Sequence, residues 1–393
     1  MNGEILAFIV YFVAIVGVGI YFFFKEKGDA TQANFFLGGR QMGPWVAAMS
    51  AQASDMSAWL LMGLPGSILA FGFGQMWIGI GLALGTAANW IFVAKRLRKF
   101  SSAAGDAITV PQYLGNRFLS KSNALQVICA IIFFVCFTIY VASAYVAGAS
   151  VFTAIFPSLS SHAAMIIFAL AMLLITFFGG FKAVCWTDFF QGILMFAALM
   201  TVPIVIAITK DMDPAALSVV YSYKDAVSGE MVECSFGTGL FDASWQDIIS
   251  GLAWGLGYFG MPHILVRFMS IEKPSMVKKS ATVAIIWVIC ALGCACLIAY
   301  FGRMFLAEEL LTAGAQKMVF IDFARKLFPS FIAGILMAAI IAASMSTADS
   351  QLLVASSSFT SDIYKPIIRK DADEKEILWV GRIIVVIVAV IAF

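Results

Sequence analysis

Asp55 lies in the middle of an apolar stretch, AQASDMSAWLLMGLPG, that covers residues 51–66. A charged side chain at the centre of a bilayer costs about 2.5–3.5 kcal/mol on insertion scales, so a carboxylate there indicates a functional site. Gly63, Pro65 and Gly66 follow in the same stretch, and they favour an interruption of the helix. Broken backbone at membrane depth is tolerated only against protein or water. The stretch therefore predicts either a binding site at a broken helix or a kinked helix with a hydrophilic entrance.

A second apolar stretch, WGLGYFGMP at residues 254–262, is also interrupted by glycines and a proline. Its Trp254, Tyr258 and Pro262 are spaced four apart, which predicts one shared helical face. Paired interrupted helices, one in each half of a membrane protein, are typical of a transporter whose binding site lies between inverted repeats. The two stretches together favour a binding site over two unrelated kinks.

A third cluster, IIAASMSTADSQLL, places Ala343, Ser346, Thr347 and Ser350 at intervals of three and four residues, so they share one helix face. Such small and hydroxyl faces commonly serve helix packing in membranes. The alternative is a cation site, because hard cations prefer oxygen ligands and a broken helix frees carbonyl groups. Asp349 lies one residue from this face, where its side chain could point to cytoplasmic water.

A fourth cluster, GGFKAVCWTDFFQ, covers residues 179–191 at a predicted helix start. Thr187 and Asp188 could cap that helix, because an acidic side chain in the first turn complements the helix dipole. A role for Asp188 on an ion's exit path is compatible with the same position.

Composition defines the elements that must position these residues. The chain has 393 residues, of which 62% are hydrophobic and 12% charged, and its mean hydropathy is +0.94. These values exclude an ordinary soluble domain and predict an all-α polytopic membrane protein. The first apolar run follows MNGEIL, which lacks the basic segment of a signal peptide, so we read it as a retained helix. Runs of about 20 apolar residues predict ten spans: 5–24, 45–72, 76–94, 125–155, 163–179, 184–209, 245–269, 281–301, 329–360 and 377–393.

Lysine and arginine residues in the connections predict the orientation. With the N-terminus outside, 19 of the chain's 25 basic residues, Arg267 among them, fall in cytoplasmic segments. The segment 210–247 is then the one sizeable exterior connection, polar and with a short helix. The net charge of +2 needs no nucleic-acid partner. The remaining basic residues, which fall outside, are Lys210, Lys224, Arg303, Lys317, Arg325 and Lys326.

Motifs for other chemistry are absent from the sequence. Seven cysteines show neither a disulfide framework nor zinc spacing, and His162 and His263 are isolated in the sequence. No nucleophile or phosphate-binding loop motif suggests an enzyme, and we expect no cofactor.

Six segments of the chain closely resemble the sodium/solute symporter family, and within it the sodium/proline symporters. The resemblance implies a leucine-transporter-like core of five plus five inverted helices, with a first repeat at 45–209 and a second at 245–393. The helix at 5–24 would be an extra N-terminal helix. These segments are LGGRQMGPW (37–45), SAQASDMSAWLLMGLPG (50–66), FTIYVASAYVAGA (137–149), GGFKAVCWTD (179–188), WGLGYFGMPHILVRFM (254–269) and AASMSTADSQLL (342–353).

The resemblance also implies the function, which is sodium-driven uptake of L-proline by a multi-pass protein of the plasma membrane. The short loops indicate the bacterial inner membrane. Asp55 would couple ion and substrate, and Asp188 would affect sodium release. The sodium ligands would be the carbonyls of Ala53, Met56 and Ala343 and the hydroxyls of Ser346 and Thr347. The proline contacts would be Trp59, Gly63, Tyr140, Trp254, Tyr258 and Pro262.

Two other functions are open at this point. The same fold could carry another amino acid, a carboxylate or a polyol, or could use protons at Asp55. Alternatively, the chain could be a transporter-like sensor module fused to a signalling domain, since similar domains occur in front of kinases.

The last predicted span, 377–393, stops inside an apolar run. Two five-helix repeats need ten core helices, and nine are predicted once 5–24 is set aside. We therefore expect the 393 residues to be a C-terminally truncated fragment whose second repeat is one helix short, which the encoding DNA beyond Phe393 would test.

Overall fold

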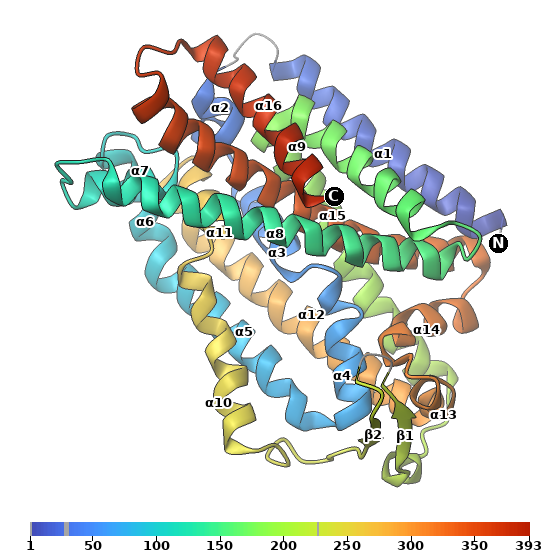
Figure 1. Ribbon diagram of the computed structural model, residues 1–393. Coiled ribbons are helices and arrows are strands. Elements are labelled where there is room, and N and C mark those ends of the chain that lie inside the picture. Colours follow the sequence, from blue (N-terminus) through green and yellow to red (C-terminus); the bar gives the residue numbers. More distant parts are fainter. Residues whose placement is uncertain (1, 27–30, 226–227) are drawn as a thin grey trace.

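The computed structural model describes residues 2–26, 31–225 and 228–393 and consists almost entirely of helices (Figure 1). The elements before the connection at 210–247 are α1 (Asn2–Glu26), α2 (Gln32–Leu37), η1 (Gly38–Arg40), α3 (Pro44–Met56), η2 (Ala58–Leu60), α4 (Gly63–Phe71), η3 (Phe73–Gln75), α5 (Met76–Ala88), η4 (Asn89–Ala94), α6 (Lys95–Ala103), α7 (Val110–Arg117), α8 (Ala124–Ile155) and α9 (Ser161–Thr209). The elements after it are η5 (Pro214–Ser218), β1 (Tyr221–Lys224), β2 (Met231–Cys234), α10 (Trp245–Ala253), η6 (Trp254–Phe259), α11 (Pro262–Ser270), η7 (Pro274–Met276), α12 (Val277–Phe305), α13 (Ala307–Thr312), η8 (Gln316–Met318), α14 (Val319–Leu327), α15 (Ser330–Phe359), η9 (Thr360–Ile368) and α16 (Glu374–Ala392).

The ten segments predicted to span a membrane all fall on these helical stretches. Among the described residues, six helical stretches are long and apolar enough to cross a membrane, or seven if the bent pair α10–η6 and α11 counts as one span. Helix α9 counts once here although it covers two predicted spans. The chain is therefore a multi-pass membrane protein with several apolar spans.

The first predicted helix interruption is present, and it begins earlier than the glycines and proline suggested. Helix α3 ends at Met56, and Ser57 adopts φ +49° and ψ −172°, outside the helical region. Its hydroxyl accepts a hydrogen bond from the Trp59 amide at 3.2 Å, which caps the short turn η2. Gly63 and Pro65 then lie in the first turn of α4, where a proline costs no helical hydrogen bond.

The second interruption separates α10 and η6 from α11, with a bend of 45°. Met261 is extended at the break, and Pro262 begins α11, a position that suits its fixed φ. The chain thus contains two interrupted helices, as the paired glycine and proline patterns predicted.

Helix α9 contains a third change of direction at Gly180, which has φ +56° and ψ −159°. A side chain there would place its Cβ 2.8 Å from the Phe35 ring, so glycine is required by both conformation and space. This residue divides the 49-residue helix close to the boundary predicted between 163–179 and 184–209.

Helix α15 forms the centre of the structure. It packs against α1, α3, α8, α9 and α16, and 83% of its most apolar window is buried. Helix α8 lies at the periphery, with only 22% of its window buried, and runs across the bundle (Figure 1). The cluster at Ala343–Ser350 is therefore inside the protein rather than facing lipid.

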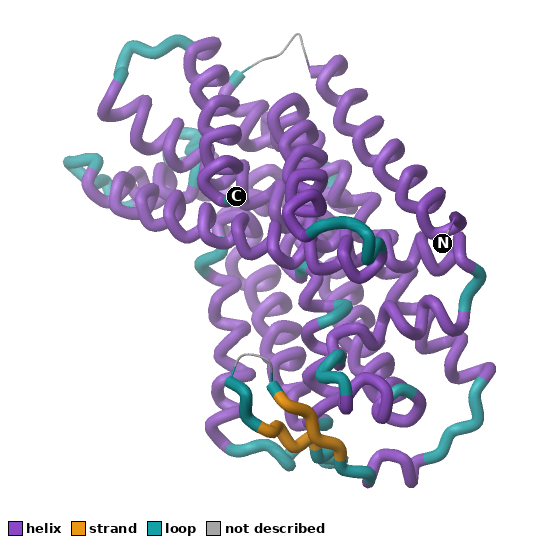
Figure 2. The backbone as a smooth tube through the Cα atoms, turned by 45° about the vertical axis from the view of Figure 1, so that its right-hand side comes forward, coloured by secondary structure: helices purple, strands orange, loops and turns teal. Residues whose placement is uncertain are grey.

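The connection at 210–247 contains the expected short helix, η5, and a β-hairpin that the sequence did not predict (Figure 2). Strands β1 and β2 are antiparallel, with Tyr221 opposite Cys234. Arg303 at the end of α12 is 1% exposed and donates hydrogen bonds to the carbonyls of Val219 at 2.5 Å and Cys234 at 3.1 Å. These hydrogen bonds from Arg303 hold the hairpin against the helix bundle.

Close glycine contacts fix α5 against the second interrupted helix. A Cβ atom on Gly85 would lie 2.3 Å from the Gly255 carbonyl oxygen, and one on Gly81 would lie 2.3 Å from that of Gly251. Because both neighbours are backbone, neither can move aside as a side chain would.

We predict that Gly85→Val lowers the free energy of unfolding by about 3 kcal/mol, because the added side chain overpacks a backbone contact. The control is Gly293→Val, where a Cβ atom meets nothing within 4 Å. Thermal melting of the two purified variants tests this, and equal melting temperatures would contradict the contact.

Candidate functional site

Four of the five residues proposed as sodium ligands meet where α15 passes the end of α3. The Ser346 hydroxyl donates a hydrogen bond to the Ala53 carbonyl at 2.7 Å and lies 3.2 Å from the Ala343 carbonyl. Thr347 donates to the same Ala343 carbonyl at 3.0 Å. All four residues are at most 1% exposed. We call these residues the oxygen cluster.

The donor set of the oxygen cluster suits a hard monovalent cation. Ala53 and the fifth residue, Met56, belong to the last turn of α3, whose carbonyls have no later helical donor. Hydroxyl and carbonyl oxygens coordinate a hard cation without adding negative charge. Both hydroxyls can rotate their hydrogens away and present lone pairs instead.

Two tryptophans connect the interrupted helices on the other side of the break. The rings of Trp59 and Trp254 are stacked, with centroids 6.1 Å apart and planes 14° apart. A Cβ atom on Gly63 would lie 2.4 Å from the Trp59 ring, so glycine makes room for this ring. Three of the predicted substrate contacts are thus brought together.

Asp55 faces the second interrupted helix. Its carboxylate interacts with the hydroxyl of Tyr258, while its Oδ2 atom is buried without a hydrogen-bond partner. Tyr140 of α8 lies near enough to interact with the Asp55 charge, and it is 46% exposed. A buried, half-satisfied carboxylate beside a broken helix is a position at which a ligand's donor or a cation can complete the hydrogen bonding.

The prediction that Trp254, Tyr258 and Pro262 share one helical face is wrong. Trp254 is 54% exposed whereas Tyr258 is 2% exposed and Pro262 is also buried. The reason is that Trp254–Phe259 forms a 3₁₀ helix with three residues per turn, so a spacing of four rotates the side chain to another side.

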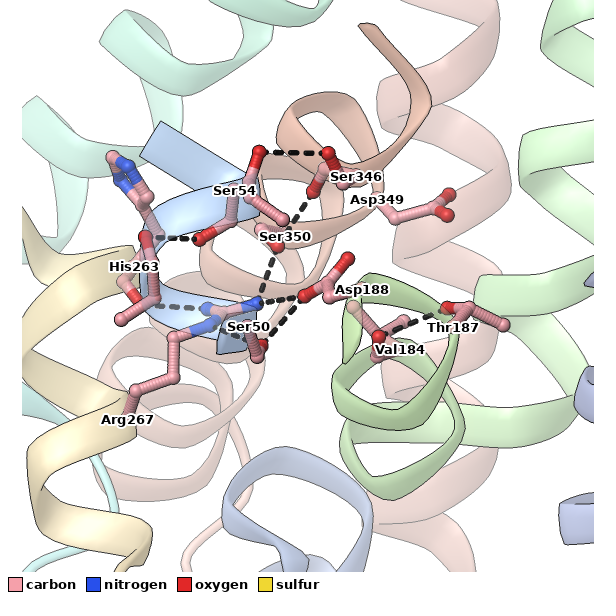
Figure 3. A network of polar contacts seen from close by, with 12 residues as sticks. Ser50, Ser54, Val184, Thr187, Asp188, His263, Arg267, Ser346, Asp349 and Ser350 are labelled. Atoms are coloured by element: carbon pink, nitrogen blue, oxygen red, sulfur yellow. Dashed lines mark hydrogen bonds and ion pairs between the residues drawn. The ribbon is translucent and has the colours of Figure 1, made fainter. Parts of the chain in front are cut away.

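Below the oxygen cluster lies a buried polar network centred on Arg267 (Figure 3). The guanidinium donates hydrogen bonds to Asp188 at 2.9 Å, Ser50 at 2.8 Å, Ser350 at 2.5 Å and the His263 carbonyl at 2.6 Å. Ser50 in turn donates to Asp188 at 2.7 Å. The network joins α3, α9, α11 and α15, and its ion pair is 0–2% exposed.

The Arg267 network is connected to the oxygen cluster by hydrogen bonds. Ser350 donates to the Ser346 carbonyl at 2.8 Å, and the Ser346 hydroxyl donates to Ala53. A polar path therefore runs from Arg267 to the end of α3.

Three sequence-based expectations about this region are wrong. Arg267 is not a basic anchor in a connection but a buried residue of α11. Asp188 and Thr187 do not cap a helix, because α9 continues through them, and Thr187 donates to the carbonyls of Ala183 and Val184. Asp349 does not point to water: it is 0% exposed and accepts a hydrogen bond from Thr176 at 2.9 Å.

The sequence missed Ser50 and the role of Arg267. A usable signal was present, because Arg267 and Asp188 are ionisable residues of opposite sign that lie inside the predicted spans 245–269 and 184–209. Charges inside a membrane protein are rarely left unpaired, so the arginine could have been matched to the aspartate.

Two interrupted helices that meet beside a buried cluster of neutral oxygen atoms define a secondary transporter. The sequence matches the sodium:solute symporter family over residues 35–393, and the chain belongs to that family. It is 41% identical to the sodium/proline symporter of Escherichia coli K12 over 392 residues, which is 99% of this chain and 76% of that protein. It is also 41% identical to sodium/proline symporter 2 of Staphylococcus saprophyticus, covering 98% of this chain and 73% of that protein.

Solved structures support the leucine-transporter-like fold. A Na⁺-coupled sialic acid symporter in a substrate-bound outward-open state superposes with a TM-score of 0.74 at 19% identity, covering 99% of this chain and 80% of that one. The transporter Mhp1 of the nucleobase-cation-symport-1 family superposes with a TM-score of 0.54 at 12% identity, covering 90% and 72% of the two chains.

We predict that Arg267→Met lowers the free energy of unfolding by about 3–5 kcal/mol, because it leaves the Asp188 carboxylate buried and unpaired. The double variant Arg267→Met with Asp188→Leu should be less destabilised than Arg267→Met alone, since no buried charge remains. Arg96→Met, at an exposed position, serves as the control. Melting temperatures that rank the double variant below the single one would contradict the pairing.

Proposed function

We propose that the chain mediates sodium-coupled symport of L-proline into the cell by alternating access. The observation that supports the sodium part most strongly is the meeting of Ser346 and Thr347 with the Ala53 and Ala343 carbonyls. The proline part is supported by the 41% identity to two sodium/proline symporters over nearly the whole chain.

In this proposal sodium binds in the oxygen cluster, with Met56 as a further carbonyl ligand. Binding there joins the end of α3 to α15 more firmly than the packing of the two helices and the Ser346–Ala53 hydrogen bond do. Asp188 lies three hydrogen bonds away from the oxygen cluster, through Ser350 and Arg267, and we propose that its pairing with Arg267 regulates release of the ion.

Proline would bind beside the Trp59 and Trp254 rings, with Gly63, Tyr140, Tyr258 and Pro262 as the other contacts. Aromatic faces suit an apolar pyrrolidine ring, and the secondary ammonium of proline would meet the unsatisfied Asp55 oxygen. Asp55 lies two residues from Ala53, so a shift of the α3 end affects both ligands. This adjacency is the proposed basis of coupling.

The driving force is sufficient for active uptake. One sodium ion crossing a potential of 100 mV contributes about 2.3 kcal/mol, and a tenfold sodium gradient adds about 1.4 kcal/mol. Together they allow accumulation of a neutral zwitterion by a factor of about 500. No covalent chemistry is required.

We further propose a location in a bacterial inner membrane, based on the short loops, with the N-terminus outside, based on the distribution of lysine and arginine. In this arrangement 45–209 and 245–393 are the inverted repeats. The Arg267 network would then close the cytoplasmic side of the site.

The rival within the family is transport of another small solute, or coupling to protons at Asp55. Uptake of labelled proline into proteoliposomes, in competition with valine and other solutes and with or without sodium, separates these cases. Uptake that requires sodium and prefers proline over valine supports the proposal.

We predict that Asp55→Asn reduces sodium-driven proline uptake by at least 100-fold, about 2.7 kcal/mol, because it preserves the volume and removes the charge. Asp371→Asn, in an exposed turn, should leave uptake unchanged. Proteoliposome uptake at matched protein density is the measurement, and near-normal uptake by Asp55→Asn would refute the coupling role.

We predict that Ser346→Ala raises the sodium concentration for half-maximal uptake about tenfold, because losing one polar contact costs about 1–2 kcal/mol. Ser344→Ala is the matched control: its hydroxyl is equally buried but donates to Ile340 in its own helix. If both variants shifted the sodium dependence equally, Ser346 would be a packing residue.

We predict that Trp254→Ala weakens proline binding at least tenfold with little change in sodium binding, because the lost aromatic surface contacts an apolar ring. Trp245→Ala removes another exposed tryptophan of the same segment and should do neither. A larger effect of Trp254→Ala on sodium than on proline would reject this assignment.

A further inference from the structure

A groove of about 410 Å³ runs along the outside of the bundle between α3, α9 and α12. Trp45 and Ile286, on two of its walls, are 52% and 56% exposed, so the groove opens to the surroundings of the protein. All the residues that line it are apolar, and they include Trp45, Phe189, Ile193, Val283, Ile286 and Trp287.

The lining residues follow each helix for one to two turns. On α9 they reach from Phe189 to Phe196, about 10 Å along the helix axis, and on α12 they reach Trp287, about 15 Å from the start of that helix. The groove therefore lies within the apolar part of the spans, where hydrocarbon chains are the available solvent.

Fixed side chains form the inner wall. The Trp287 indole donates a hydrogen bond from Nε1 to the Gly192 carbonyl at 3.2 Å and lies against the Phe196 ring, with centroids 6.3 Å apart. Trp287 is only 3% exposed. The wall is therefore preformed rather than assembled by a ligand.

A positive charge lies at one end of the groove. Lys279 is exposed, and its Nζ atom lies 5.7 Å from the centroid of the Trp45 ring. This is the end of the helices that we assign to the cytoplasm. Basic pockets between membrane helices on that side attract anionic lipid headgroups.

We propose that this groove binds an anionic phospholipid, with one acyl chain along the apolar wall and the phosphate at Lys279. A protein partner fits less well, because protein interfaces combine an apolar centre with a polar rim and about 1,000 Å² or more of buried surface. Here the lining is apolar, and the cation Lys279 lies at the end where a headgroup would lie.

The test uses the purified full chain, which is titrated with phosphatidylglycerol and, separately, with neutral phosphatidylcholine, while native mass spectrometry counts the bound lipids. We expect the wild type to prefer phosphatidylglycerol. Lys279→Gln should weaken phosphatidylglycerol binding about fivefold, equivalent to about 1 kcal/mol, without affecting phosphatidylcholine. Ile286→Trp, which fills the groove, should weaken both lipids at least tenfold.

Matched controls lie on the same helix. Lys278→Gln removes the neighbouring exposed lysine, and Ile289→Trp enlarges an exposed residue that does not line the groove. Both should bind lipid as the wild type does, and Lys279→Arg should retain the preference. The proposal is overturned if the wild type does not discriminate between the two lipids, if the controls lose as much binding, or if Ile286→Trp changes the oligomeric state instead of the lipid count.

Discussion

The central constraint on this structure is that a carbonyl group freed from a helix inside a membrane must find another partner. Breaking α3 at Met56 leaves the carbonyls of its last turn without helical donors, and each unsatisfied group would cost several kcal/mol in hydrocarbon. Helix α15 supplies the partner, because its Ser346 hydroxyl reaches Ala53 at 2.7 Å. The same oxygens that satisfy the break in this conformation form the ligand set that a cation would use. The interruption, the burial of α15 and the proposed sodium site are therefore consequences of one requirement.

The Arg267 network meets a second requirement, which is that charged side chains buried inside the bundle must be paired and hydrogen-bonded. A buried ion pair is costly unless its remaining hydrogen-bonding groups are satisfied. Arg267 has four acceptors on four different helices, and Asp188 also accepts from Ser50. Helices α3 and α11, each next to an interruption, pack against each other, and this side chain adds a hydrogen-bonded link between them. A transporter must be able to separate these helices during its cycle. A few hydrogen bonds can be exchanged for hydrogen bonds to water more readily than a packed apolar interface can be opened.

Much of this architecture could be predicted from the sequence, because the length of an apolar run and the glycines and prolines that interrupt it determine structure locally. The ten helical segments, both interruptions and the hydroxyl face of α15 follow from such patterns. What could not be predicted depends on contacts between distant segments. The break at Ser57 rather than Gly63 depends on a strained dihedral, and the exposure of Trp254 depends on a 3₁₀ turn that spacing alone does not reveal. Arg267 was misplaced because a charge near a helix end resembles a membrane anchor until its partner, Asp188, is known.

The most direct measurement of the central claim is a crystal structure of the protein in thallium(I), a monovalent cation that replaces sodium and is located by its anomalous scattering. The account predicts an anomalous peak between α3 and α15 that contacts the carbonyl oxygens of Ala53 and Ala343 and the hydroxyls of Ser346 and Thr347, with the Ser346 hydrogen turned away from Ala53. A peak elsewhere, with the Ser346 hydroxyl still bonded to the Ala53 carbonyl, would contradict it.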